Sequence, residues 1–325
     1  MPGFTTHYIF GMKAYNDMPF TPLKHTIAKY RWLYQLGLQG PDMFFYNIPI
    51  LRHRDYRNVG SYMHEHKVNA FFECCLRRIG TIRSRQQQEE AISYLAGFIN
   101  HYIADSICHP YVYGRIGYPV DAPTSMHHGM HAHLENELDA ILLWKYKKKK
   151  PSEFNQTATI CLNGQEIQFI SHFLASCINE TYYPITYRNN FQVTPAMVHR
   201  SIWALRFGCR TLSDKNGKKK FGIAQVESIF VNHPVASAKM VTDSVTDYRS
   251  SCNLNHEAWG NPWDPTRVST ASFVDLFHET LDKCSRVYAL LNSAVTDNVP
   301  LDKQDLSPLL TELGNESYHS GLPVE

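Results

Sequence analysis

Apolar residues recur at helical spacing along most of the chain. In the first half this periodicity predicts four helices, over residues 22–37, 60–80, 87–109 and 128–148. Pro110 is expected to end the third of these helices, because proline lacks the N–H that a continuing helix needs. In the second half the periodicity returns over residues 171–185, 195–212, 223–249 and 270–293. The pattern therefore predicts an all-α, multi-helix bundle.

Two segments depart from this pattern. Residues 157–170 place β-branched side chains on both sides of Asn163-Gly164, a pair that suits a tight turn, and predict a small β-hairpin. Residues 300–325 are expected to form a loosely structured tail. We expect a single domain over residues 1–325, in which 1–150 hold the chemistry and 171–295 add packing helices.

Composition narrows the class of protein. Hydrophobic residues make up 43% and charged residues 19% of the chain, and the formal net charge is +2, too small to predict a nucleic-acid partner. No leader-like or membrane-spanning apolar run is evident, so a cytoplasmic location is expected. The basic clusters Lys145 to Lys150 and Lys218 to Lys220 are interpreted as solvated helix ends, with peripheral contact to a lipid surface as the alternative.

Histidines are concentrated in the first half, where eleven of the seventeen lie between His7 and His133. His101 and Asp105 are four residues apart in an otherwise apolar helix, as are His131 and Glu135 in the next, so each pair shares a helix face. Burying such groups is costly unless a cation compensates, and zinc prefers imidazole and carboxylate ligands. The pattern therefore predicts a metal site between these helices.

The segments THYIFG, GPDMFFY, MHEH, HYIADSICHPY and HxxxENELD resemble the zinc-dependent phospholipase C family, whose superfamily includes the S1/P1-type nucleases. The resemblance covers roughly residues 1–150. It implies an all-α fold with two or three zinc ions. It also implies the following ligands: His7, Asp42, His64, His101, Asp105, His109, His131 and Glu135.

The resemblance further implies how these ligands divide between the ions. One zinc would take Asp42, His64, His101 and Asp105; a second would take His109, His131 and Glu135; a third would take His7, with Asp105 bridging.

Competing candidates lie in the same segments. His66 competes with His64, and the pair His133 and Glu137 competes with His131 and Glu135, which keep the family register. His127 and His128 are treated as supporting or solvated residues. The following histidines are treated as structural: His25, His53, His172, His199, His233, His278 and His319.

The sequence departs from the family pattern in two places. The family's third zinc is completed by an N-terminal tryptophan, for which Pro2 is the nearest substitute here. Only three residues separate Asp105 from His109, where the secreted enzymes have five, a spacing that an uninterrupted helical turn accommodates.

The resemblance implies hydrolysis of a phosphate ester, with phospholipid as one candidate substrate and Asp42 as both ligand and general base. Five aromatic residues are expected to line the pocket: Phe44, Phe45, Tyr46, Tyr111 and Tyr113. Trp259 and Trp263 are expected to anchor a loop on the bundle, with a rim over the cleft as the alternative. Two alternative functions remain: a nuclease or small-molecule phosphoesterase, and a non-catalytic zinc-binding scaffold.

Overall fold

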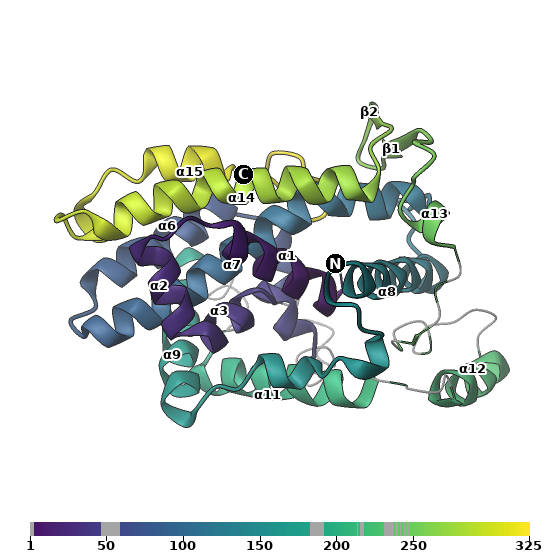
Figure 1. Ribbon diagram of the computed structural model, residues 1–325, viewed down its shortest axis with the longest axis horizontal. Coiled ribbons are helices and arrows are strands. Elements are labelled where there is room, and N and C mark those ends of the chain that lie inside the picture. The colour runs from purple at the N-terminus through teal and green to yellow at the C-terminus, as the bar shows by residue number, and fades with distance from the viewer. Residues whose placement is uncertain are drawn as a thin grey trace.

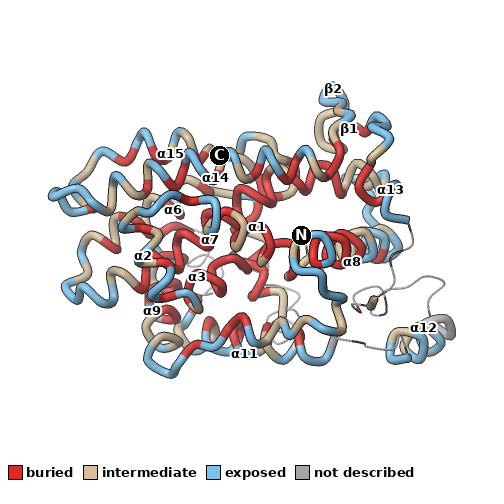
Figure 2. Tube along the Cα trace, viewed as in Figure 1, coloured by how far each residue is buried: buried red, intermediate tan, exposed pale blue. Residues whose placement is uncertain are grey.

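The fold is seen in a computed structural model, which describes residues 3–46, 59–182, 192–212, 214, 218–230, 237, 240, 242, 243, 245 and 247–325. The chain forms helices packed around one long central helix, α7 (Arg85–Arg115), most of whose residues are buried (Figures 1 and 2). Helices from both halves of the chain pack on α7, among them α3 and α14. The expected all-α fold is confirmed.

The helices before α7 are α1 (Phe4–Asp17), α2 (Pro22–Lys29), α3 (Arg31–Gly37), the 3-10 helix η1 (Gly40–Tyr46), α5 (Val59–Glu65) and α6 (Val68–Thr81). Those after it are α8 (Ser125–Lys147), η2 (Pro151–Glu153), η3 (Gln156–Thr159), α9 (Gly164–Thr181), α11 (Pro195–Leu212), α12 (Lys218–Phe230), α13 (Tyr248–Ser251), α14 (Phe273–Thr296), η5 (Leu301–Lys303) and α15 (Ser307–Leu313).

Two of the expected helices are broken into shorter ones. The helix expected over residues 22–37 divides at Tyr30 into α2 and α3. The one expected over 60–80 divides into α5 and α6 at Lys67, whose φ of 49° is left-handed and cannot continue an α-helix. The first break lets α3 pack along α7, and the second places His64 in the last turn of a separate short helix.

The β-hairpin predicted at residues 157–170 is wrong. Asn163 is instead the N-cap of α9: its side chain accepts from the backbone N–H groups of Gln165 and Glu166, while Glu166 accepts from the Asn163 N–H. This reciprocal capping box explains why Asn-Gly begins a helix here rather than a turn between strands. Gln156–Thr159 is a single 3-10 turn.

The hairpin that does occur lies at β1 (Trp259–Asn261) and β2 (Asp264–Ser269), two antiparallel strands with a register irregularity at Gly260/Asn261. The continuous helix predicted over residues 223–249 is only partly confirmed. Residues 223–230 belong to α12, which ends at Phe230, and α13 begins at Tyr248, but the described residues 240, 242, 243, 245 and 247 between them are not helical.

Pro110 does not end α7, contrary to expectation. The helix continues to Arg115, although Pro110 cannot donate to the carbonyl of Ser106 one turn earlier. Gly321, from the C-terminal segment, packs against that carbonyl so closely that a Cβ there would lie 2.5 Å from the Ser106 oxygen. The interior proline thus gives a chain segment far away in sequence a place to pack.

The tail expected over residues 300–325 is ordered, which corrects that expectation. It contains η5 and α15, whose buried Leu309 and Leu313 pack in the core, and an antiparallel bridge between Glu316 and Pro323. Hydrogen bonds tie it to distant elements, including one from the Lys67 N–H to the carbonyl of Glu325.

Candidate metal centre

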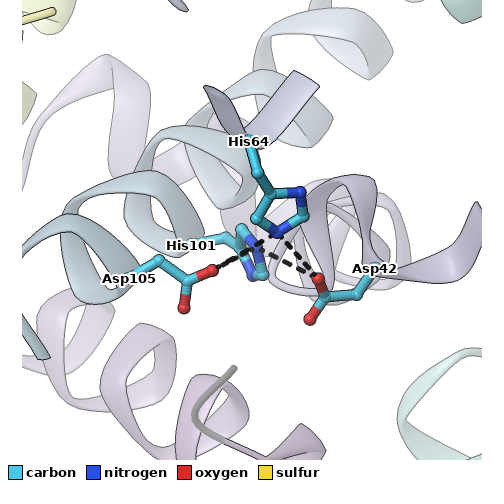
Figure 3. Close-up of side chains that lie close together, drawn as sticks. All are labelled: Asp42, His64, His101 and Asp105. Atoms are coloured by element: carbon cyan, nitrogen blue, oxygen red, sulfur yellow. Dashed lines mark ion pairs between the residues drawn. The ribbon is translucent and has the colours of Figure 1, made fainter. Parts of the chain in front are cut away.

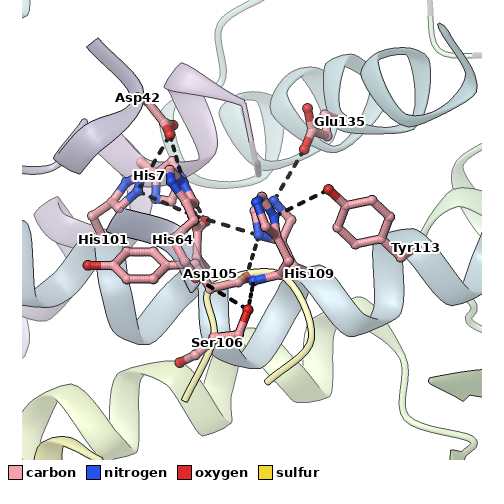
Figure 4. A network of polar contacts seen from close by, with 12 residues as sticks. His7, Asp42, His64, His101, Asp105, Ser106, His109, Tyr113 and Glu135 are labelled. Carbon is pink, nitrogen blue, oxygen red and sulfur yellow. Dashed lines mark hydrogen bonds and ion pairs between the residues drawn. The ribbon is translucent and has the colours of Figure 1, made fainter. Parts of the chain in front are cut away.

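Five elements direct histidine and carboxylate side chains to one place beside the middle of α7 (Figure 4). α7 contributes residues from three successive turns, namely His101, Asp105 and His109. The other elements contribute His7 (α1), Asp42 (η1), His64 (α5), and His131 with Glu135 (α8).

A first group consists of Asp42, His64, His101 and Asp105, all buried, with one ligand atom from each within 4.8 Å of the others (Figure 3). His64 Nε2 lies 3.3 Å from Asp42 Oδ1, and His101 Nε2 lies 3.2 Å from Asp105 Oδ2. Two carboxylates and two imidazoles at this separation form a donor set that suits zinc.

A second group consists of His109, His131 and Glu135, which also meet within 4.8 Å. His131 Nε2 lies 2.6 Å from Glu135 Oε1, and His109 Nε2 lies 3.6 Å from the same oxygen. The two groups adjoin at α7, where His109 Nδ1 lies 3.7 Å from Asp105 Oδ2.

His7 approaches the first group from α1. Its Nε2 lies 3.1 Å from Asp105 Oδ1, and its ring stacks on His101 with the centroids 4.0 Å apart. Asp105 therefore turns one oxygen toward His7 and the other toward His101, as a bridging carboxylate would. Met1 and Pro2, the residues relevant to a third zinc, lie outside the described residues.

Backbone carbonyls orient three of the imidazoles. Nδ1 of His64, His101 and His109 lies 2.6, 3.1 and 2.7 Å from the carbonyl oxygens of Gly60, Leu38 and Tyr318, respectively. A carbonyl can only accept, so each ring carries its proton on Nδ1 and presents Nε2 as a free lone pair. This is the arrangement that orients metal-binding histidines.

The protonation states also suit a cation. Burial raises the pKa of Asp105, but the nearby imidazoles of His109, His101 and His7 lower it more, and the net pKa lies well below its ordinary value. Burial lowers the pKa of His109 to about 3 and also lowers that of His131. At neutral pH these groups are an ionised carboxylate and neutral imidazoles, the forms that bind metal.

Several of these buried atoms have no hydrogen-bond partner among the described residues. They are both nitrogens of His7, both carboxylate oxygens of Asp105, Asp42 Oδ1, and Nε2 of His64, His101 and His109. Unpaired polar atoms are rare and costly in protein interiors. That so many point at one another is explained if a cation lies between them, so the residues present fit zinc.

The competing residues lie elsewhere. His66 follows the end of α5, and its ring is tilted against that of Tyr62, with the centroids 4.2 Å apart. His133 is 51% exposed, and its partner Glu137 is hydrogen-bonded to Ser251. His127 caps the start of α8, with Nδ1 2.9 Å from the hydroxyl of Thr124.

Sequence reasoning missed the contribution of the C-terminal segment. Tyr318 is buried against His64, and its N–H donates to the His64 carbonyl at 2.9 Å while its own carbonyl accepts from His109. His319 stacks on His64 at a centroid distance of 4.9 Å and lies 5.6 Å from His109. This segment has no helical periodicity, so no sequence pattern connects it with the site.

The aromatic residues expected to line a pocket fall into two sets. Phe45 lies 5.4 Å from His64 and Tyr113 lies 4.5 Å from His131, measured between centroids, so both are at the site. The other three pack away from the ligand atoms: Phe44 in the core, Tyr46 against Gly208 of α11, and Tyr111 against Trp259.

Of the two tryptophans in the hairpin, Trp259 packs away from the ligand residues and Trp263 lies near them. Trp259 is buried, and its indole N–H donates to the carbonyl of Ala271, as expected for a loop anchor. Trp263 instead packs edge-on against Tyr113, with the ring centroids 4.8 Å apart. Tyr113 and Trp263 therefore form an aromatic pair next to His131.

The helix that carries His7 is capped by a residue from α8. The N-cap residue, Gly3, has no side chain to cap α1, but the buried carboxylate of Asp139 accepts from the backbone N–H groups of Thr5 and Thr6 at 3.1 and 2.7 Å. A Cβ at Gly3 would lie 2.4 Å from Asp139 Oδ2, so glycine makes room for this contact. Asp139 thereby joins the two helices on which His7 and Glu135 lie.

We expect the Asp139→Ala variant to lose about 1–2 kcal/mol of unfolding free energy, because two N–H groups at the start of α1 lose their acceptor. Urea denaturation measures this loss. Asp17→Ala, at the exposed end of the same helix, is the matched control and should change stability by less than about 0.5 kcal/mol. Equal stability of Asp139→Ala and wild type would show that the cap does not stabilise the fold.

An all-α architecture with buried histidines and carboxylates converging on one helix defines the class as a helical protein with a candidate zinc centre. The family model described as zinc dependent phospholipase C matches residues 6–186, which is more than half of the chain. The chain belongs to this zinc-dependent phospholipase C family. No curated protein and no solved structure matches it.

Proposed function

We propose that the protein is a zinc-dependent hydrolase of phosphate esters, with its active site at the two groups beside α7. The observation that supports this most strongly is the convergence of unpaired, buried imidazole nitrogens and carboxylate oxygens from elements inside the matched region. Zinc held there would supply Lewis acidity, which lowers the pKa of water and offsets negative charge on a phosphoryl group.

Residues of the chain itself would accept the proton, orient the ligands and exclude water. Asp42 lies among the ligands of the first group, so we propose it as the acceptor of a proton from an attacking water as well as a ligand. The carbonyls of Gly60, Leu38 and Tyr318 hold the imidazoles in one tautomer. Phe45 beside His64, and Tyr113 with Trp263 beside His131, would restrict water near the phosphate.

The test is zinc content per chain by elemental analysis, together with hydrolysis of a soluble aryl phosphodiester before and after chelation. We expect two or three zinc ions per wild-type chain and turnover that chelation removes. His131→Ala should lose zinc from the second group, because only His109 and Glu135 remain there.

His133→Ala is the matched control, two residues away on the same helix and half exposed, and should keep its zinc and its turnover. Asp42→Asn tests the proton acceptor: zinc retained with full turnover would exclude this role. Negligible zinc after reconstitution of wild type would overturn the site. Zinc without turnover on phospholipid, nucleotide and aryl phosphodiester substrates would favour a scaffold.

A further inference from the structure

The outer face of α11 carries two large exposed aromatic side chains. Trp203 is 63% and Phe207 54% exposed, and their rings stack at a centroid distance of 5.3 Å and an interplanar angle of 10°. Apolar surface of this kind is costly in water and, when it is contiguous, marks a contact surface. Figure 2 shows the exposed side of α11 along the outside of the molecule.

Arginines flank this pair along the helix. Arg200, Trp203, Phe207 and Arg210 follow one another at spacings of three, four and three residues, so they share one face, which we call the α11 outer face. Arg200 and Arg210 are exposed. The sequence of α11 also contains Arg206 and no aspartate or glutamate, although the whole chain has 32 basic and 30 acidic residues.

The opposite side of α11 is fixed to the body of the protein. Val198, Ile202, Leu205 and Cys209 are buried at helical spacing, and the helix packs on α9 and on η1, which carries Asp42. The α11 outer face is therefore presented by a helix that is already folded, one layer away from the candidate metal centre.

A lysine cluster directly precedes, in sequence, the residues that lie beside Arg210. Arg210 lines a cavity together with residues 151–157, which directly follow the lysine cluster Lys145 to Lys150 at the end of α8. Trp144, just before these lysines, is another exposed aromatic residue. Exposed aromatic and basic side chains thus occur together a second time.

We propose that the α11 outer face docks the protein on an anionic phospholipid surface. Trp and Phe side chains partition into the boundary between headgroups and acyl chains, and arginines of the same helix pair with lipid phosphates. No helix among the described residues is long and apolar enough to cross a bilayer. That the docked protein also hydrolyses lipid rests on the function proposed above.

The aromatic geometry favours lipid over single-stranded nucleic acid. Proteins that bind single strands stack bases on their aromatic side chains. Trp203 and Phe207 instead stack on each other, which leaves no space for a base between them. Both rings can still enter a headgroup layer together.

The experiment is co-sedimentation of the full-length protein with vesicles of phosphatidylcholine alone and of phosphatidylcholine with phosphatidylserine. We expect binding to the anionic vesicles that weakens with salt. The double variant Trp203→Ala/Phe207→Ala should bind at least about tenfold more weakly. Arg200→Ala and Arg210→Ala should each weaken binding about fivefold.

Phe20→Ala is the matched control, since Phe20 is 99% exposed and has Lys24 beside its ring, but it lies outside α11. It should bind like wild type. Wild-type binding by the double variant, or equal wild-type binding to neutral and anionic vesicles, would overturn the proposal. Binding of a single-stranded oligonucleotide that the double variant loses, without vesicle binding, would overturn it in favour of nucleic acid.

Turnover of a soluble aryl phosphodiester separates this proposal from the proposed function. The double variant should hydrolyse that substrate as wild type does, because neither aromatic residue belongs to the metal centre. Vesicle binding by a wild-type protein that hydrolyses no phosphate ester would support docking and contradict only the proposed function.

Discussion

Replacing Asp105 with asparagine is expected to remove zinc from the first group and to slow phosphate-ester hydrolysis by on the order of a thousandfold. Asp105 is surrounded by imidazoles, with His7 and His101 at 3.1 and 3.2 Å and His64 and His109 each at 3.7 Å. Asparagine has nearly the same shape as aspartate but lacks the negative charge that lies between these imidazole rings. The thousandfold figure corresponds to losing about 4 kcal/mol of transition-state stabilisation by a metal.

Zinc content and soluble phosphodiester turnover of Asp105→Asn test this expectation. Asp139→Asn is the matched control, because Asp139 is also a buried aspartate but belongs to neither ligand group. It should keep its zinc, since an asparagine oxygen can still accept at the start of α1. A full zinc complement in Asp105→Asn would show that the bridging position is wrong.

The parts of the site that lie within one helix could be predicted from the sequence. His101 with Asp105, and His131 with Glu135, are paired by the spacing of four residues alone. The convergence of Asp42, His64 and His7 depends on how η1, α5 and α1 pack in three dimensions. Helical spacing within one segment cannot predict this packing. Only the resemblance to a family suggested it.

The errors have physical causes, one of them local and the other distant in sequence. Asn163-Gly164 suits a turn, but Glu166 completes a capping box three residues later, and this sequence signal could have predicted the start of α9. Pro110 was expected to end α7, yet the carbonyl that it leaves free is packed by Gly321. No local rule includes a partner more than two hundred residues away.

The C-terminal segment was missed for a related reason. One of its contributions to the metal centre is a backbone carbonyl, that of Tyr318, and any residue type supplies a carbonyl. Sequence patterns report side chains, so a contact of this kind leaves no trace in them. Its importance is therefore best tested by deletion.

Deleting residues 315–325 is expected to weaken zinc binding about 10- to 100-fold, the usual effect of losing a partner that orients a metal ligand. His109 would lose the acceptor that fixes its tautomer, and His64 would lose both the ring of Tyr318 and the N–H that donates to its carbonyl. The ordering of α5, which Tyr318 ties to the rest of the fold, should weaken as well. Zinc affinity by competition with a chelator and the thermal midpoint measure the two effects.

Tyr318→Ala separates orientation from packing. It removes a buried ring that contacts His64 and Tyr102, and so should destabilise the fold by about 3–5 kcal/mol, as large core truncations do. It keeps the backbone carbonyl, so in the folded protein His109 keeps its acceptor. Zinc affinity should therefore fall less in Tyr318→Ala than in the deletion. Wild-type zinc affinity in the deleted protein would show that the carbonyl of Tyr318 does not orient His109 for metal binding.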